Sequence, residues 1–342
     1  MQSNQARRTL GSWFKTLVQY RVLLAVLSPL LFTGSFGVSK ADWRTDLGVF
    51  RVGIVVGEDV AGNLARVELF RLALSEALGM NVEIFPARNM SSLIEAHRGS
   101  RIEYAIYSAS AYAATWILCE CVEPLVLPLA VDQTSTFRAV VISGPSGPGN
   151  LRDLKLENLA IPRSRAVGAS EIAMYELEKQ GVLPKGVSEL APTGKMMSSE
   201  QAVNGMLDGK FGAMLGWSSM IGDNLSGYSR GSLKALAEAN GGEAAGYNII
   251  WQSLDIPHPP HAIRKNLPAE AKRILRETLQ QLFSEDPSAY DSIELQYGGG
   301  FAVARHGQFL SVLDFVRVKM GINDASSKIA GEVAGTGEKK KQ

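Results

Sequence analysis

The chain has 342 residues, of which 46% are hydrophobic and 20% are charged, and its formal net charge is +1. This composition is ordinary for a globular protein, and the length allows two domains of normal size. Lys and Arg barely outnumber Asp and Glu, so the charge balance argues against binding to a nucleic-acid backbone, and we expect no nucleic-acid partner.

Residues 1–41 have the pattern of a secretory signal peptide. Basic residues precede an apolar run of about 17 residues, VLLAVLSPLLFTGSFGV, and Ser39 and Ala41 are the small residues expected before a cleavage site. The alternative is an uncleaved anchor helix, but this run is shorter than the ~20 residues that a membrane span needs. We expect cleavage after Ala41 and release into the periplasm, without a lipid anchor because no cysteine lies near the cleavage region.

The chain after residue 41 begins with strands that alternate with helices. The segment VFRVGIVVG predicts a strand, and residues 61–78 predict a helix because apolar residues recur at spacings of three and four before Gly79. NVEIFPA predicts a second strand, residues 91–98 a short helix, and RIEYAIYS a third strand.

Cys119 and Cys121 are the only cysteines and are separated by one residue. A disulfide between positions so close is geometrically awkward, and two thiols alone are too few for a structural zinc site. We expect two buried, unpaired side chains, so that the fold depends on its core without cross-links.

The same order of elements recurs in the second half of the chain. ENLAIP predicts a strand, residues 165–180 a helix, VSELAP a strand, residues 198–207 a helix, and GKFGAMLG a strand. Strands that alternate with helices imply mainly parallel sheets flanked by helices. The sequence therefore predicts a two-lobed α/β fold.

Two extended segments are predicted to cross between the lobes, one ending in FRAVVIS and the other containing NIIWQ. Residues 268–285 predict an amphipathic helix that packs back onto the first lobe. We expect lobe 1 to comprise residues 48–137 and 251–320, and lobe 2 residues 138–250. Residues 321–342 lose periodicity and are expected to be disordered.

The sequence contains no complete enzyme motif. TGKMM lacks the Ser or Thr and the upstream glycine of a P-loop. GWSSM begins like a nucleophile elbow, but Met220 occupies the position of the closing glycine. The four histidines show no metal-ligand spacing, and His258 and His261 bracket a rigid Pro-Pro turn. We expect no catalytic residue, no metal and no cofactor.

A ligand site is predicted where strands end and helices begin, because solutes bind open α/β sheets at the carboxyl ends of strands. These loops supply hydroxyls, aromatic rings, carboxylates and cations, which suits a small polar solute that is bound without chemistry. Several of these residues could instead be rim or core residues. The candidates are Glu58, Tyr107, Ser108, Ser110, Tyr112, Thr136, Arg163, Ser164, Arg165, Lys195 and Trp217.

The order of segments over residues 50–320 resembles the phosphonate/phosphite-binding family of periplasmic receptors for ABC transporters. The most specific stretches are ALSEALGMNVEIFPARNMSSLIEAHRG, GPGNLRDLKLENLAI and IIWQSLDIPHPPHAIRKNLPAEAKRIL. The resemblance implies a type II periplasmic-binding-protein fold, capture of a solute by lobe closure, and a membrane permease with its ATPase as partners. A receptor that diffuses freely also fits the signal peptide without a lipid cysteine, and we expect it to be a monomer.

The ligand residues of that family are only partly retained. The family's Ser-Thr-Ser-Gly anion turn reads Arg165-Ala166-Val167-Gly168 here, and a family tyrosine and a family histidine are replaced by Met90 and Met196. The third-strand tyrosine is retained as Tyr107. The resemblance therefore adds Met90, Val167, Gly168 and Met196 as site positions.

These exchanges predict a different ligand from a simple phosphonate. Each hydrogen bond to a charged group contributes roughly 1.5–3 kcal/mol, so the lost hydroxyls and imidazole would weaken phosphonate binding considerably. Arg165 can bind a carboxylate or phosphate in bidentate fashion, and the apolar replacements suit a solute with an apolar part. We expect a small organic anion bound by Arg165 and a helix N-terminus.

Two other functions remain open at this point. A sensory binding protein for a membrane receptor needs the same closed, liganded form, so the sequence does not separate it from an importer component. An enzyme built on the same fold needs an acid–base pair or an activated nucleophile, and the adjacent Glu58 and Asp59 are expected to diverge on an extended segment.

Overall fold

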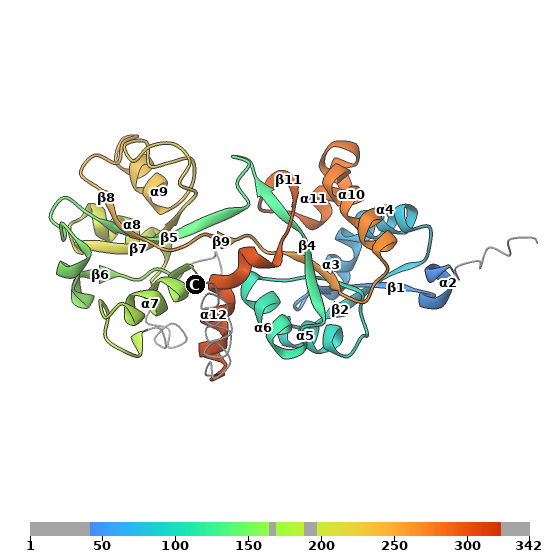
Figure 1. The fold of residues 1–342 in the computed structure, drawn as a ribbon. Coiled ribbons are helices and arrows are strands. Elements are labelled where there is room, and N and C mark those ends of the chain that lie inside the picture. Colours follow the sequence, from blue (N-terminus) through green and yellow to red (C-terminus); the bar gives the residue numbers. More distant parts are fainter. Residues whose placement is uncertain (1–41, 164–168, 188–196, 323–342) are drawn as a thin grey trace, which may run out of the picture. The chain divides into compact units, whose positions relative to one another are not determined.

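The computed structural model describes residues 42–163, 169–187 and 197–322 (Figure 1). The predicted signal peptide and residues 323–342 of the predicted tail lie outside the described part. The chain divides into two compact units, residues 1–46 and 47–342. A short helix, α2 (Trp43–Leu47), spans that boundary, and both sheets belong to the second unit.

The first sheet has the strand order β11-β4-β10-β3-β1-β2. Strands β2 and β3 run parallel to β1, whereas β10 is antiparallel to β3 and β4, and β11 is antiparallel to β4. The strands are β1 (Phe50–Val55), β2 (Val82–Ala87), β3 (Tyr104–Ile106), β4 (Val122–Ala130), β10 (His261–Arg264) and β11 (Gly298–Val303).

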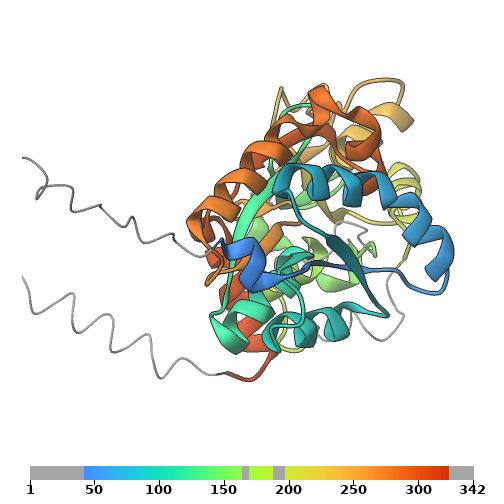
Figure 2. The same ribbon diagram turned by 90° about the vertical axis from the view of Figure 1, so that its right-hand side faces the viewer.

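Helices cover both faces of the first sheet (Figures 1 and 2). The helices α4, α10 and α11 pack against one another, and α10 also packs on β4 and β11, whereas α5 packs on β1 and contacts α6. The helices of this part are α3 (Val60–Arg66), α4 (Glu68–Leu78), α5 (Met90–Arg98), α6 (Ala109–Cys119), α10 (Ala269–Glu285), α11 (Pro287–Ile293) and α12 (Leu310–Lys319). A 3₁₀ turn, η5 (His306–Phe309), precedes α12.

The second sheet has the strand order β6-β7-β5-β8, and β9 pairs with the beginning of β5. Strand β6 is parallel to β7, and β5 is antiparallel to β7 and β8. The strands are β5 (Thr136–Ser143), β6 (Leu159–Ala160), β7 (Ala213–Ser218), β8 (Asn248–Gln252) and β9 (Ile256–Pro257). Its helical elements are η1 (Leu151–Asp153), η2 (Leu156–Asn158), α7 (Ala169–Lys179), α8 (Ser199–Leu207) and α9 (Ser232–Ala239).

The predicted α/β fold is confirmed, but the sheets are mixed instead of mainly parallel. The difference arises because β10 and β5 each enter their sheet from the other sheet, so no crossover helix joins them to the neighbours with which they pair antiparallel. The predicted helix over 61–78 is broken at Val67 into α3 and α4. Gly79 ends α4 as predicted, with a left-handed φ of 63°. NIIWQ lies within β8, so the return toward the first sheet follows this segment.

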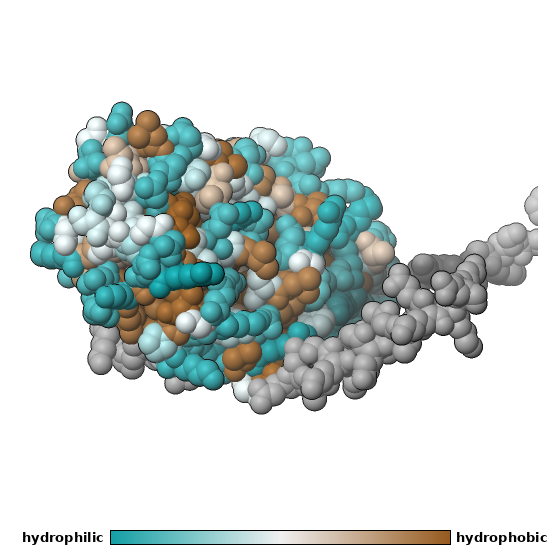
Figure 3. All heavy atoms as spheres, turned by 60° about the vertical axis from the view of Figure 1, so that its left-hand side comes forward, coloured by the Kyte–Doolittle hydropathy of each residue, from teal (hydrophilic) through white to brown (hydrophobic). Residues whose placement is uncertain are grey.

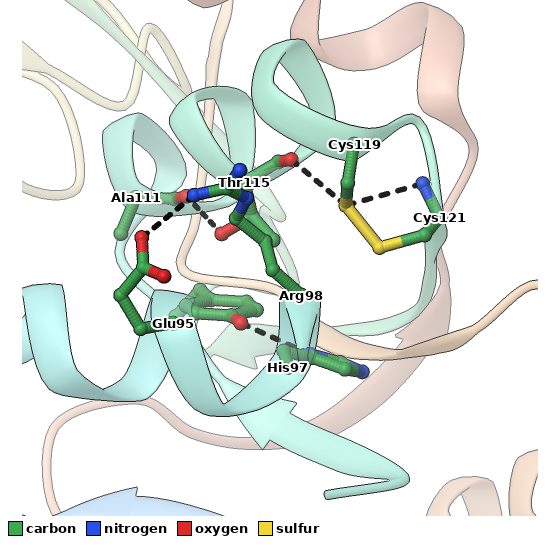
Figure 4. The surroundings of a disulfide bond; sticks show 8 residues. Glu95, His97, Arg98, Ala111, Thr115, Cys119 and Cys121 are labelled. Carbon is green, nitrogen blue, oxygen red and sulfur yellow. Dashed lines mark hydrogen bonds and ion pairs between the residues drawn. A yellow bond between two sulfur atoms is a disulfide. The ribbon is translucent and has the colours of Figure 1, made fainter. Parts of the chain in front are cut away.

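The expectation of unpaired cysteines was wrong, because Cys119 and Cys121 form a disulfide (Figure 4). Cys119 ends α6, and Glu120 adopts a left-handed backbone with a φ of 49°. That turn brings the two Cα atoms to 5.0 Å, within the ordinary range for a disulfide. The bond joins residues two positions apart, so it links no distant segments and the core still carries the fold.

Most of the large hydrophobic side chains are buried in the cores that the two sheets form with their helices. Phe70, Leu74 and Leu78 on α4 are fully buried, and Val140, Leu233 and Leu236 form part of the core of the second sheet. Figure 3 shows apolar residues interspersed with hydrophilic ones on the face drawn there. Within residues 42–163, 169–187 and 197–322, no helix combines the length and apolarity that a membrane crossing needs.

One core contact joins an ionisable ring to a predicted site residue. His97 Nδ1 lies 2.9 Å from the hydroxyl of Tyr107, and both residues are buried. Burial, aided by the positive charge of Arg264, lowers the pKa of His97 to about 3. The imidazole is therefore neutral in the folded protein at neutral pH.

This buried histidine makes stability depend on pH. Unfolded His97 binds a proton near pH 6.5, but folded His97 does so only near pH 3. Unfolding thus takes up a proton between these values, and stability falls with falling pH by about 1.4 kcal/mol per unit for such a histidine. We expect His97→Asn to give a shallower decline of the unfolding free energy between about pH 6 and pH 4, measured by urea denaturation. Equal slopes in the two proteins would contradict a neutral His97.

Candidate functional site

A cavity of about 1180 Å³ is lined by residues from both sheets. Ile54 and Val55 end β1, Ile106 ends β3, and Trp217 lies near the end of β7; all four line this cavity. The cavity therefore lies at the carboxyl ends of strands, where the topology predicted a site.

Three helices begin at the cavity wall. Met90 is the first residue of α5, Ser108 is the N-cap of α6, and Ser198 is the N-cap of α8. The serine hydroxyls accept the N–H groups of Ala111 and Gln201, each at 3.1 Å. The remaining N–H groups of each first turn have no intrahelical acceptor, and each helix N-terminus carries a positive partial charge. The wall is therefore favourable to an anion at three places.

Three arginines line the same cavity, and their environments differ. Arg66 donates to the carbonyl of Ser292 and to Asn63 Oδ1. Arg163 is exposed, and its backbone N–H donates to the Met197 carbonyl at 2.7 Å, which places it beside the start of α8. In the described part of the chain, no carboxylate pairs with Arg163.

Arg230 is held in one position by a polar cluster. Its Nε donates to Asp132 Oδ2 at 2.9 Å and its Nη2 to Thr134 Oγ1 at 2.7 Å. Partial burial alone would raise the pKa of the Asp132 carboxyl, but hydrogen bonds from Arg230, Ser229 and Thr134 lower it well below its usual range. The guanidinium lies 5.6 Å from the ring centre of Trp217, within cation–π distance.

Four rings form one continuous part of the lining, which we call the aromatic wall: Phe137, Trp217, His258 and Tyr297. Phe137 meets Trp217 edge-on with centroids 5.9 Å apart and is nearly parallel to His258 at 6.2 Å. The rings of His258 and Tyr297 are 4.4 Å apart. Trp217 and Tyr297 are partly exposed, whereas Phe137 and His258 are buried, so the first two rings supply most of the apolar surface that the wall offers.

The structure brings some of the predicted site residues together and separates others. Met90, Tyr107, Ser108 and Trp217 line the cavity, as does the candidate cation Arg163. The hydroxyl of Tyr107 is nevertheless hydrogen-bonded to His97 in the core. The candidates Ser164, Arg165, Val167, Gly168, Lys195 and Met196 lie outside the described residues.

Four predicted residues do not line the cavity: Glu58, Ser110, Tyr112 and Thr136. Tyr112 is fully buried on α6, and its hydroxyl lies 2.8 Å from His306 Nδ1, so it packs toward η5. Glu58 is exposed just before the Asp59 cap of α3. Ser110 lies within α6 as well and Thr136 begins β5, so the direction of each side chain depends on the helix or strand that carries it.

Several lining residues were missed by reasoning from the sequence, above all Arg66, Arg230, His258 and Tyr297. Arg66 fell inside a helix that was expected to continue, and His258 was interpreted as part of a rigid turn. The sequence did contain one indication for His258, because the prolines on both sides of it favour an extended backbone.

The chain was compared with known protein families and solved structures. The model of a family described as "ABC transporter, phosphonate, periplasmic substrate-binding protein" matches residues 52–306. A protein from Xanthomonas citri, solved bound to ATP, has a TM-score of 0.51 and 12% identity, covering 81% of this chain and 100% of that chain. The same protein bound to chloride ion has a TM-score of 0.51 and 13% identity, with 80% and 99% covered.

A binding-protein component of an ABC phosphonate transporter from Pseudomonas aeruginosa was also found. It has a TM-score of 0.45 and 17% identity, with 84% of this chain and 93% of that chain covered. At such identities, the likeness to the Xanthomonas citri structures concerns the fold alone.

The pairing of Arg230 with Asp132 makes a prediction about stability. The Asp132 side chain is only 9% exposed and that of Arg230 22% exposed. We expect Asp132→Asn to lower the free energy of unfolding by about 1–3 kcal/mol, since the charge-assisted hydrogen bonds are lost. Urea denaturation at pH 7 measures this change.

The matched control is Asp255→Asn, which breaks the exposed pair of Asp255 with Arg138, whose side chains are 56% and 36% exposed. An exposed pair contributes less than about 1 kcal/mol. Equal losses in the two variants would show that the Asp132 cluster has no special role.

Proposed function

Because the chain belongs to the family of periplasmic phosphonate-type substrate-binding proteins of ABC transporters, we propose that it captures a small organic anion and delivers it to a membrane permease with its ATPase. Members of this family are solute-binding components of transport systems, and the fold is that of type II periplasmic binding proteins. The finer proposal concerns the solute, the residues that bind it and the movement that encloses it.

The observation that carries the proposal is the charge of the cavity wall. Arg66, Arg163 and Arg230 line the cavity together with the N-termini of α5, α6 and α8, whereas Glu200 is the carboxylate among the described lining residues. Helix N-termini and arginines both favour anions, and arginine binds carboxylates and phosphates in bidentate fashion. Arg230 is already paired with Asp132, but a cation or a neutral sugar would leave Arg163 without an anionic partner among the described residues.

The size and composition of the cavity favour a solute with an apolar part. Its volume of about 1180 Å³ is slightly above the usual range for small-molecule sites, about 300–1,000 Å³. The aromatic wall adds apolar surface that a methyl-sized phosphonate would not cover. An organic carboxylate or phosphate with an apolar portion satisfies both parts of the lining.

We propose the binding residues from two facts: some line the cavity, and the others follow a lining residue along the chain. Met90, Ser108, Arg163 and Trp217 line the cavity. Residues 164–168 follow Arg163 along the chain, so we assign Arg165 a contact with the anion and the remaining candidates of that turn a place beside it. The solute is bound and released without chemical change.

Two features of the site support the proposal of capture by closure. The cavity takes residues from two sheets, and the chain passes between those sheets through residues 131–135 and through residues 253–260, which include the short strand β9. Residues 48–137 with 251–320, and residues 138–250, are the proposed moving lobes. Bending in the two connections would enclose the solute without disturbing either core.

Anion binding is tested by isothermal titration of the mature protein with matched phosphonates and carboxylates. We expect Arg163→Gln and Arg165→Gln each to weaken binding roughly 10- to 150-fold, which corresponds to about 1.5–3 kcal/mol for a charged hydrogen bond. Arg152→Gln is the control, because Arg152 is exposed and does not line the cavity. Tight methylphosphonate binding that neither cavity variant changes would refute this proposal.

Closure is tested by small-angle X-ray scattering of the mature protein. We expect the radius of gyration to fall when a bound anion saturates the site, because the two lobes approach one another. A radius that stays constant at saturation would rule out capture by closure while leaving anion binding in place.

A further inference from the structure

We propose that the aromatic wall binds a planar ring of the solute, and that His258 Nε2 accepts a hydrogen bond from a donor on that ring. The solute class is then an aromatic or heteroaromatic organic anion with an N–H or O–H group on its ring. This inference rests on the proposed function, because the anionic group of the same solute is bound by the arginines and helix N-termini.

The register of the strands places three of the four rings on one face. Trp217 pairs with Ala139, two residues from Phe137, so both side chains lie on the same side of the β5–β7 ladder. Thr136 pairs with Pro257, and the His258 N–H donates to the Ser135 carbonyl at 2.9 Å, which continues the same pairing. His258 therefore projects on the side of Phe137, consistent with their nearly parallel rings.

The wall is held rigidly before any solute binds. His258 lies in a Pro-His-Pro-Pro segment whose backbone is restricted by its prolines. Its Nδ1 bonds to the Pro128 carbonyl at 2.8 Å, and Arg230 covers part of Trp217. Phe137 is 7% exposed and His258 2% exposed. A preformed aromatic surface loses little conformational entropy when a flat ring packs against it.

The tautomer of His258 determines what Nε2 can recognise. A carbonyl oxygen can only accept a hydrogen bond, so Nδ1 carries the proton in its bond to Pro128. Burial lowers the pKa of His258 to about 4, and the ring is therefore neutral at pH 7. Nε2 then carries a lone pair, and it can accept but not donate.

This acceptor is available to a solute. His258 lines the cavity, and among the described residues none donates to Nε2. An acceptor that is enclosed by a bound solute and left without a donor is costly. A site of this kind discriminates strongly against a ligand that lacks the donor.

The test uses probes that differ in one property at a time. Phenylacetate and cyclohexylacetate share a carboxylate and differ in the planarity of the ring; indole-3-acetate and 1-methylindole-3-acetate differ in the ring N–H. We expect isothermal titration of the mature protein to show at least 10-fold tighter binding of phenylacetate than of cyclohexylacetate, and of indole-3-acetate than of its methyl derivative.

Single substitutions test which residue causes the preference for a planar ring and which causes the preference for a ring N–H. His258→Phe keeps a ring but removes the acceptor, so we expect the indole preference to disappear while the preference for a planar ring remains. Tyr297→Leu should reduce the planar-ring preference, whereas Tyr175→Phe, on α7 and away from the cavity, should change neither. Each preference is a ratio of affinities measured on one preparation, so partial loss of folded protein does not alter it.

The outcomes separate this inference from the proposed function. If aliphatic and aromatic anions bind equally well, the ring inference is overturned and anion binding stands. If the methyl derivative binds as tightly as indole-3-acetate, the role of His258 is overturned. If none of the four carboxylates binds, while small aliphatic phosphonates do, the aromatic solute class is rejected; if no anion of either kind binds, the proposed function fails with it.

Discussion

The antiparallel pairing of β5 is the constraint on which the site depends. Its first residues pair with β9, and the rest of the strand pairs with β7 and β8. One strand thus belongs to the second sheet and to the connection that leads back to the first. Because paired residues project to the same side, this register aligns Phe137, Trp217 and His258 along the cavity. A shift by one residue would turn these side chains to the opposite face.

The three arginines of the cavity differ in how far neighbouring groups already satisfy them. Arg230 lies in the lining but is already compensated by Asp132, which lies two residues after the end of β4. Arg66 is hydrogen-bonded to a backbone carbonyl, whereas Arg163 is exposed beside the start of α8. A cation that is already paired orients its neighbours, and an exposed cation retains its attraction for a solute. The three arginines are therefore suited to different tasks.

Much of the fold was predictable from short-range patterns. The helices over 91–98 and 198–207 and the strand in GKFGAMLG were placed within a few residues, since their apolar periodicity and capping residues lie in adjacent turns. The position of the site at strand ends also followed from the order of elements. The errors arose at single residues where the backbone departs from the helical pattern: Val67 interrupts a periodic helix, and the left-handed Glu120 allows Cys119 to meet Cys121.

The sequence by itself determined the α/β class, the family and the loops from which the cavity is built, because these depend on periodicity and on the order of segments. Only the tertiary structure decided which side chains enter the cavity. Tyr107 was chosen from its position at a strand end, yet His97, a core residue, holds its hydroxyl. His258 lies far along the chain from Phe137 and becomes its neighbour through strand pairing. The direction of a side chain depends on strand register and on partners distant in sequence, and a local sequence pattern predicts neither of them.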